Sequence, residues 1–361
     1  MKEKLRVAIW IVFLSRPAWL QAGALYSITD LGVLPGGSIT AAASISSNGL
    51  VTGSGDSASA SSQPFLWSPG AGLTALAVNS TLAFGTGINA SGVAVGYMFS
   101  DDFSTYRAFS SDGADIPTLG GASNASTGIN DSGTIVGYSL TTNGSILGFS
   151  YSSSGTITPL GTLPGGSTSS ANAINGSGLI VGQADVAGLS YAVVFNGANP
   201  TDLGLPSGYQ SSYASAVSNA GQVAGTLNDG LGGTMAFLWV SDTVTTLGAL
   251  TSSGDSRAYG VNSSGDVVGS SDGVAFLYED GGIYDLNALL ADPLLGWQLT
   301  EADAINDLGQ IAGTGNLNGQ QHAFLLDPQT SVPEPASLLL TCGGLLLAAL
   351  SSRCLRKENR V

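Results

Sequence analysis

The sequence is poor in residues that supply reactive side chains. It has one histidine, His322, and two cysteines, Cys342 and Cys354, both near the C-terminus. Nucleophilic serine chemistry depends on a general base, usually histidine, and a structural zinc site requires four ligands that are mostly nitrogen or sulfur. We therefore expect no serine-hydrolase triad and no zinc site. Because residues 25–331 hold no cysteine, they contain no disulfide.

Basic residues are also scarce away from the termini. Residues 25–331 contain only Arg107 and Arg257 against 22 acidic residues, a formal charge of −20. A surface of this sign repels phosphate backbones, which excludes nucleic-acid binding. We interpret the acidic residues as a solvated surface, with Asp131 and Asp307 serving their own turns, and expect no cofactor. Weak Ca²⁺ uptake by Asp-bearing loops is the alternative, but no Asp-x-Asp-x-Asp-Gly loop supports it.

Amphipathic runs of helical length are absent between residues 25 and 330. Instead, short apolar pulses alternate with Gly, Ser, Thr and Asn; 52 of the 361 residues are glycine and 43% are hydrophobic. This pattern is typical of many short strands joined by tight turns, and the hydrophobic content argues against disorder. The sequence predicts an all-β fold.

What the chain has in abundance is one ten-residue pattern, which occurs seven times. Its last copy, residues 304–313, reads Ala-Ile-Asn-Asp-Leu-Gly-Gln-Ile-Ala-Gly. The first glycines of the copies are spaced 41 to 45 residues apart: Gly49, Gly92, Gly133, Gly178, Gly221, Gly265 and Gly309. The Asn and this Gly tolerate the left-handed backbone of a tight loop, so each copy predicts a hairpin of two short strands.

Two further elements also occur seven times. An Ala-Phe pulse follows each hairpin, as at residues 323–324, and a Thr-x-Leu-Gly strand follows the pulse, as at residues 245–248. Four short strands in about 43 residues make one propeller blade. The last unit lacks its final strand, and the spare copy stands at residues 28–32. We predict a seven-bladed β-propeller closed by the N-terminal strand; a pair of β-sandwiches and an open β-solenoid are the alternatives.

The N-terminal residues 1–24 have the features of a secretory signal peptide. Lys2, Lys4 and Arg6 form a positive start, and an apolar segment over residues 7–14 predicts a signal helix. The small residues Ala22 and Ala24 form the predicted cleavage site. The mature chain then begins with the predicted propeller domain, residues 25–326.

The C-terminal part has three segments. Residues 327–337 form a linker that carries Val332, Pro333, Glu334 and Pro335. Residues 338–361 combine an apolar run with a basic tail, which predicts a short transmembrane helix. The basic residues would hold the tail on the cytoplasmic side of the membrane.

Two resemblances follow from these motifs. The Pro333-Glu334-Pro335 motif, the short apolar helix and the arginine-rich end resemble a PEP-CTERM sorting signal. This resemblance implies a Gram-negative bacterium, passage through the inner membrane by the secretion machinery, and processing by an exosortase-type enzyme. Such bacteria often make extracellular polysaccharide. The repeats resemble the HAF family of extracellular repeat proteins, named after the triplet found here as residues 322–324.

Three glycine-rich loops are the candidate ligand-binding positions. They contain Pro35, Gly36 and Gly37, then Gly120 and Gly121, then Pro164, Gly165 and Gly166. In a propeller these loops would connect the outer strand of one blade with the inner strand of the next, all on one face. They open no helix, so we expect no phosphate site at a helix terminus; plain surface turns are the alternative.

Aromatic and acidic residues leave further alternatives open. Tyr151 and its equivalents recur just after the Ala-Phe pulse, which predicts packing between blades, with a sugar-stacking surface as the alternative. Those equivalents are Trp67, Trp239 and Tyr278. Glu279 and Glu301 are the only glutamates of residues 25–331, and the sequence does not place them near each other.

The sequence therefore predicts an exported, non-enzymatic propeller at the cell envelope or in the extracellular matrix, such as that of a biofilm. We expect it to bind polysaccharide or a surface protein. One alternative is a glycan hydrolase or lyase that uses carboxylates in the propeller channel. Another is a purely structural surface component.

Overall fold

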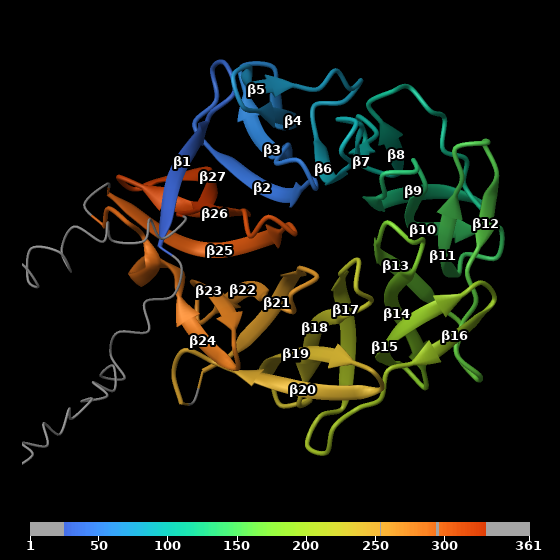
Figure 1. Ribbon diagram of the computed structural model, residues 1–361. Helices are drawn as coiled ribbons and strands as arrows, with labels where there is room; N and C mark the ends of the chain where they lie inside the picture. The colour runs from blue at the N-terminus through green and yellow to red at the C-terminus, as the bar shows by residue number, and fades with distance from the viewer. Residues whose placement is uncertain (1–24, 253, 294–295, 330–361) are drawn as a thin grey trace, which may run out of the picture. The chain divides into compact units, whose positions relative to one another are not determined.

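The computed structural model describes residues 25–329 except 253, 294 and 295. Within this range, Tyr26–Pro328 form one compact unit of seven antiparallel sheets arranged in a ring (Figure 1). Six of these sheets have four strands and one has three. The predicted all-β, seven-bladed propeller is confirmed.

In six of the seven blades the strands run in chain order from the centre of the ring outward; in the last blade β25, β26 and β27 do so. The inner strands are β2 (Thr40–Ile45), β6 (Ala83–Ile88), β9 (Gly120–Ile129), β13 (Ser169–Ile174), β17 (Ser211–Val217), β21 (Ser256–Val261) and β25 (Trp297–Ile305). The second strands are β3 (Val51–Ser57), β7 (Ala94–Phe99), β10 (Ile135–Thr141), β14 (Ile180–Val186), β18 (Val223–Asn228), β22 (Val267–Ser271) and β26 (Ile311–Leu317).

The remaining strands complete the blades. The third strands are β4 (Ala60–Ser68), β8 (Tyr106–Ser110), β11 (Ile146–Tyr151), β15 (Leu189–Asn196), β19 (Thr234–Val240), β23 (Val274–Glu279) and β27 (Gln320–Pro328). The outer strands are β5 (Gly72–Ala75), β12 (Ile157–Pro159), β16 (Asn199–Asp202), β20 (Thr243–Gly248), β24 (Gly282–Asp285) and β1 (Tyr26–Gly32). A single 3-10 turn, η1 (Leu286–Leu289), follows β24 in the described part of the chain.

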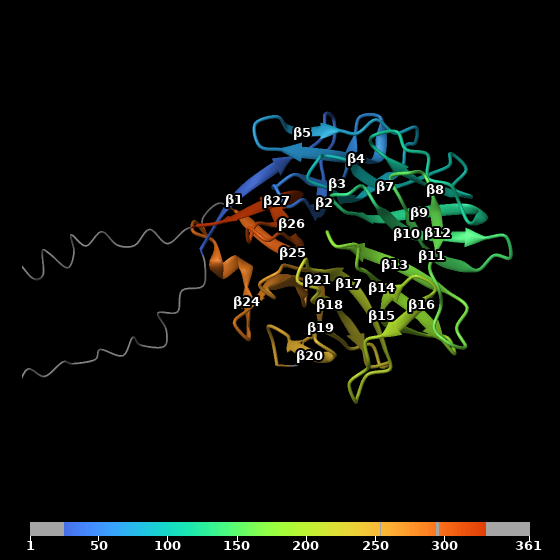
Figure 2. The ribbon, with the colours of Figure 1, turned by 45° about the vertical axis from the view of Figure 1, so that its right-hand side comes forward.

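The ring closes through the two ends of the unit. β1 pairs antiparallel with β27 and is the outer strand of the blade formed by β25, β26 and β27 (Figure 2). His322 on β27 also contacts Asp30 on β1, with 2.9 Å between Nδ1 and Oδ1. The N-terminal strand therefore completes the last blade, as the spare copy of the fourth element predicts. β27 reaches Pro328, beyond the predicted end of the repeats at residue 326.

The asparagine of the ten-residue repeat acts within its own hairpin and between blades. The side-chain oxygen of Asn175 accepts a hydrogen bond from the backbone N–H of Leu179, 2.9 Å away in the same hairpin. Its amide nitrogen donates to the carbonyl oxygen of Ser218, the equivalent residue of the next blade, at 2.8 Å. The same link to the next blade is made by Asn89, Asn130 and Asn306. The first glycines of the repeat have the predicted left-handed backbone, but the asparagines do not. The asparagine serves the hairpin through its side chain instead, and the link between blades adds to this role.

Every inner strand carries a β-bulge opposite the last glycine of the repeat. At Gly225, an added Cβ would overlap the carbonyl oxygen of Tyr213 and the ring of Phe237. The equivalent overlap with an inner-strand carbonyl occurs at Gly53, Gly96, Gly137, Gly182, Gly269 and Gly313. Glycine is needed here because two backbones approach closely, and the bulge turns one extra side chain of each inner strand toward the channel.

The Ala-Phe element forms the core between neighbouring blades. The phenylalanines that are at most 1% exposed are Phe65, Phe149, Phe237, Phe276 and Phe324. The aromatic residues that follow this element are also packed: Trp67 and Tyr151 are buried, and Trp239 and Tyr278 pack against clusters formed by their own blade and the preceding one. The structure confirms the predicted packing role of these four residues.

One blade departs from the four-strand prediction. Residues 116–120 are predicted to form its outer strand, but the described residues of this blade form only β6, β7 and β8. Instead, Nδ2 of Asn124 on β9 donates to the carbonyl oxygens of Ile116 and Pro117, at 3.0 Å each. The backbone carbonyls of this segment are therefore hydrogen-bonded by the next blade and not by a neighbouring strand of their own blade. Gly120 and Gly121, predicted to lie in a loop, are the first two residues of β9, so that assignment is wrong.

Among the described residues, no helix is long and apolar enough to cross a membrane. The predicted signal helix and cleavage site, residues 332–335 and the predicted C-terminal helix all lie outside the described residues.

Candidate functional site

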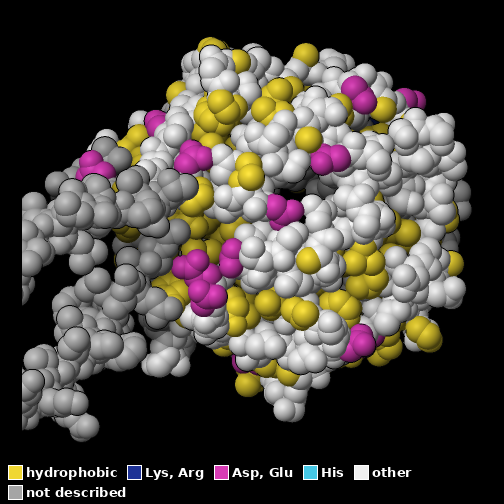
Figure 3. Space-filling model, viewed as in Figure 1, with side chains coloured by type: hydrophobic (Ala, Val, Ile, Leu, Met, Phe, Trp, Pro, Cys, Tyr) yellow, Lys and Arg dark blue, Asp and Glu magenta, His cyan; other side chains and the backbone are white. Residues whose placement is uncertain are grey.

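The connections between strands define two faces of the propeller. The loop face carries the segments that lead from the outer strand of one blade to the inner strand of the next. The hairpin face carries the hairpins of the ten-residue repeat. In the view of Figure 3, a hollow opens near the centre of the ring, and acidic side chains are spread over several blades. A ligand site is therefore to be sought in the central channel or over one face.

Two of the three predicted ligand loops are tight turns on the loop face. Pro35 and Gly36 are the central residues of a turn closed by a hydrogen bond of 2.9 Å from Gly37 N to Leu34 O. Gly36 has a φ of +76°, which favours glycine. The same turn is formed by Pro164, Gly165 and Gly166. The glycines of these two loops are therefore explained by turn geometry.

A carboxylate at the end of the second strand holds each of these turns. The carboxylate of Asp56 accepts hydrogen bonds from the backbone N–H of Ile39 and of Ser38, both at 2.7 Å. These two bonds lower the pKa of Asp56 below its ordinary value. Asp185 holds the second turn in the same way, accepting from the backbone N–H of Ser167 at 2.9 Å. Part of the acidic surface thus has a structural role, and ligand binding by the loops stays a prediction.

The central channel is divided into two chambers by a ring of β-branched residues. One such residue from each inner strand lines both chambers: Ile45, Ile88, Ile129, Ile174, Val217, Val261 and Ile305. The chamber on the hairpin face has a volume of about 160 Å³ and the chamber toward the loop face about 230 Å³. The ring is an apolar belt in an otherwise polar channel.

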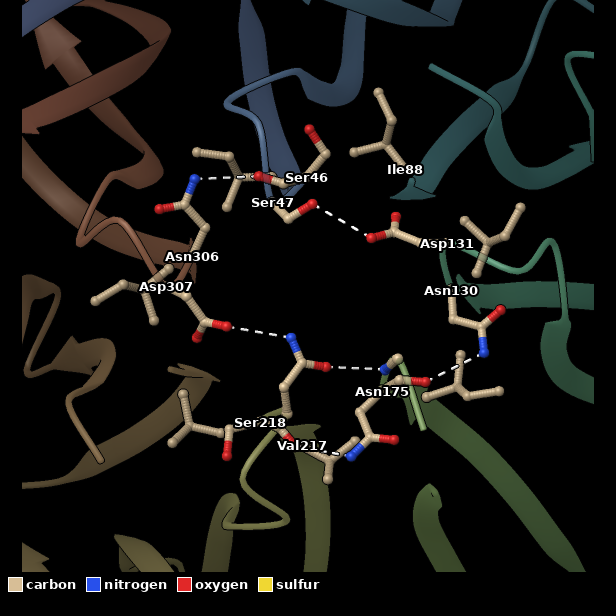
Figure 4. A pocket seen from close by; sticks show the side chains of 17 residues that line it. Ser46, Ser47, Ile88, Asn130, Asp131, Asn175, Val217, Ser218, Asn306 and Asp307 are labelled. Atoms are coloured by element: carbon tan, nitrogen blue, oxygen red, sulfur yellow. Dashed lines mark hydrogen bonds between the residues drawn. The ribbon is translucent and has the colours of Figure 1, made fainter. Parts of the chain in front are cut away.

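Asp131 and Asp307 line the chamber on the hairpin face, where they connect hairpins of different blades (Figure 4). Asp131 accepts hydrogen bonds from the backbone N–H of Ala90 at 2.8 Å and from the hydroxyl of Ser47 at 3.3 Å. Asp307 accepts from the side-chain amide of Asn219 at 3.1 Å. The prediction that these residues serve their own turns is wrong, because their partners lie in other blades.

The loop-side chamber contains two titratable side chains supplied by bulges, Tyr259 on β21 and Asp303 on β25. Asp303 Oδ2 accepts a hydrogen bond of 3.0 Å from the hydroxyl of Thr314. Burial and, in addition, the neighbouring Glu301 carboxylate raise the pKa of Asp303 to about 8, against the opposing effect of that hydrogen bond. Burial also raises the pKa of Tyr259 to about 12. A carboxylic acid that stays protonated near neutral pH has the property a general acid requires.

The two core glutamates have different surroundings. Glu301 adjoins Asp303, whereas Glu279 lies at the end of β23, where Asp266 and Asp280 are its acidic neighbours. Burial, helped by these two aspartates, raises the pKa of Glu279. Among the residues that the structure describes, no three His, Cys, Asp or Glu side chains are arranged to hold a metal ion.

A connected set of six aromatic rings lies toward the loop face, on β6, β7, β8, β10 and the connection between β7 and β8. We call it the aromatic track: Phe84, Tyr97, Phe99, Phe103, Tyr106 and Tyr138. Neighbouring ring centroids lie between 5.3 and 6.4 Å apart. Phe103 is 59% exposed, and the other five residues are half-buried. The track therefore combines one exposed ring with five rings that are partly accessible.

Each end of the aromatic track enters a groove. The first groove, of about 520 Å³, lies between the first two blades and is lined by Phe84 and Tyr97 together with Ile39. The second groove, of about 490 Å³, is lined by Tyr106 and Tyr138. Its polar lining includes Asn172, Gln183 and Asp185. The starts of inner strands line both grooves, which places both toward the loop face.

The sequence analysis missed the aromatic track and the role of Asp303. Tyr97 and Tyr138 share one position, directly after the last glycine of two consecutive copies, but the other four rings do not follow the repeat, so the set as a whole leaves no periodic signal. The density of Phe and Tyr over residues 84–106 could have indicated a special surface. Asp303 carried no signal, because the bulge and the channel position that raise its pKa are tertiary features.

Comparisons with known proteins leave the family of the chain open. No protein-family model matches it, and no curated protein matches. A gluconolactonase from Xanthomonas campestris has 12% identity and a TM-score of 0.41, covering 87% of this chain and 94% of that one. The extracellular domain of a one-component system protein from B. thetaiotaomicron has 12% identity and a TM-score of 0.48. That match covers 83% of this chain, which spans 39% of the length of the other.

Proposed function

We propose that this chain is an exported, non-catalytic β-propeller that binds a polysaccharide at the cell envelope or in the extracellular matrix. The observation that carries the proposal is the aromatic track, whose rings, five half-buried and one exposed, lie between two grooves on one face. Sugar rings offer apolar C–H faces and polar rims, which match aromatic rings flanked by a few polar groups. A surface protein is the other ligand that exposed aromatic rings suit.

A second candidate function is supported by the loop-side chamber. Asp303 lines this chamber with a raised pKa, and a second carboxyl group, that of Glu301, is close enough to contribute to the rise. Glycan hydrolysis requires such a pair, with one acid and one carboxylate. In this alternative the chain is a glycan-active enzyme, Asp303 donates the proton, and the aromatic track positions the polymer.

One assay separates the two functions. The mature exported protein is incubated with surface polysaccharide from the cells that make it, and both bound polymer and released fragments are measured. We expect saturable binding without fragments. Fragments that disappear in the Asp303→Asn variant would replace the binding proposal with the enzymatic one. Neither binding nor fragments would contradict both and favour a purely structural component or a protein ligand.

The place of action is proposed from the sequence alone. The signal features of residues 1–24 and the resemblance of residues 332–361 to a PEP-CTERM signal support export and handling by an exosortase-type enzyme. The C-terminal helix would anchor the chain in the inner membrane during transit. In cells that make a chain without residues 332–361, we expect more protein in the medium and less in the envelope fraction. An unchanged distribution would contradict a sorting role.

A further inference from the structure

We propose that the aromatic track and its two grooves form the binding site for a neutral polysaccharide chain. The inference rests on the proposed function and adds the site, the path of the ligand and its charge class. The aromatic track joins the first groove, at Phe84 and Tyr97, to the second groove, at Tyr106 and Tyr138. This is an extended path from the first blade to the fourth, and a linear polymer fits such a path better than a small compact ligand does.

The path offers stacking surface along its length. Tyr97 lies 5.3 Å from Phe84 and 6.3 Å from Tyr106, and Tyr106 lies 6.2 Å from Tyr138, measured between ring centroids. Phe103, on the connection between β7 and β8, adds the most exposed ring. Since these rings pack against one another, their orientation is already fixed, and little side-chain entropy is lost when a ligand binds.

Charge decides against an acidic polymer. In the described part of the chain, no Lys, Arg or His lines either groove, while Asp56 lines the first and Asp185 the second. The tyrosines of the track add no charge, since a phenol with a pKa of 10 or above is neutral at pH 7, and burial raises the pKa of Tyr138 further, to about 12. Arg107, next to the aromatic track in sequence, donates from Nε to Asn124 Oδ1 at 3.2 Å. In the two grooves, a polymer of uronic acids would therefore meet Asp56 and Asp185 and no basic lining residue.

The two acidic groups are themselves committed to the fold. Asp56 and Asp185 add negative charge at the grooves, and Oδ1 of each already accepts hydrogen bonds from a turn on the loop face. Gln183 and Ser190 add an amide and a hydroxyl to the second groove, the kinds of group that pair with sugar hydroxyls. The recognition chemistry is thus stacking combined with neutral hydrogen bonding.

The test uses the mature protein and the surface polysaccharide of the producing cells, separated by anion exchange into neutral and acidic fractions. We expect retention on the neutral fraction that changes little with salt, and weak or no retention on the acidic fraction. Phe103→Ala and Tyr106→Ala should each weaken binding by about tenfold, which corresponds to roughly 1.4 kcal/mol. The control is Tyr284→Ala, which removes an aromatic side chain of 38% exposure on β24, in a different blade, and should bind as wild type does.

Each outcome bears on a defined claim. If wild type binds the neutral fraction and both track variants bind equally well, the site is wrong while the proposed function stands. Tight binding to the acidic fraction alone would overturn the charge class. If neither fraction binds, the proposed function itself fails. Thermal melting of each variant shows whether it folds; because Phe103 is 59% exposed, its replacement leaves the core intact and keeps the test decisive if Tyr106→Ala unfolds.

Discussion

Removal of β1, residues 26–32, is expected to open the ring and abolish cooperative folding. β1 supplies the outer strand of the last blade, and Tyr26 and Leu31 are each only 4% exposed. Losing two buried side chains and a ladder of backbone hydrogen bonds costs roughly 8 kcal/mol. This loss is comparable with the total stability of a typical domain, about 5–15 kcal/mol. The edge of β27 would also be left unpaired and prone to aggregation.

The measurement is urea unfolding followed by tryptophan fluorescence. The control is a chain that starts at Tyr26, which keeps β1 and should unfold as the mature protein does. A synthetic peptide of residues 25–33 should restore folding to the shortened chain, because it can add a strand to the exposed edge of β27. An open stack of blades would lose only local stability, so an unchanged unfolding midpoint would contradict closure by β1.

Replacement of Asp303 by Asn is expected to stabilise the protein at alkaline pH. The pKa of Asp303 rises from 3.8 to about 8 in the folded chain, because of burial and then the Glu301 carboxylate. Between these pH values the folded state keeps a proton that the unfolded state releases. The contribution of this residue to stability therefore falls as pH rises from about 4 through about 8. Asn stays neutral throughout and can still accept the hydrogen bond from Thr314.

We expect Asp303→Asn to raise the free energy of unfolding at pH 8 by about 2 kcal/mol. This value is smaller than the full pKa shift would give, because water enters the channel and screens the charge. For a chain of this size the melting temperature rises by roughly 5 °C, and the difference disappears near pH 4. Asp56→Asn is the matched control of opposite sign: since the pKa of Asp56 is lowered, that variant should lose stability at neutral pH and approach wild type on acidification. A pH-independent effect of Asp303→Asn would contradict the channel environment.

The repeat and its closure are local properties and could be predicted. A hairpin loop tolerates only a few residue types, so Asn, Gly and their flanking apolar residues return in every blade and reveal the number of blades. The spare copy at residues 28–32 revealed the closure as well, because an outer strand needs a partner that the end of the chain supplies. The sequence did not indicate that one blade lacks its fourth strand. The backbone carbonyls of that segment are hydrogen-bonded by Asn124 of the next blade, which is a tertiary contact.

The bulges were also beyond prediction, although their residues are part of the repeat. In the sequence, the last glycine of each copy looks like one more small residue. In the structure the inner strand lies so close to it that any side chain there would overlap a backbone carbonyl oxygen. Asn175 likewise reads as a turn residue until the carbonyl of Ser218 lies within reach of its amide. The role of the glycine depends on the close packing of the adjacent strand, and the role of Asn175 depends on a residue of the next blade.

The sequence by itself thus determined the all-β class, the number of blades and the pairing of the two ends. Each of these follows from short segments that recur at a regular spacing along the chain. Only the tertiary structure brought together the surface that we propose as a ligand site. The rings of Phe84 and Tyr138 lie 54 positions apart and occupy different places in their repeats, and they belong to one surface only because adjacent blades bring them into the same row. The protonation of Asp303 has the same origin, since burial in a channel built by seven blades is a property of the closed ring.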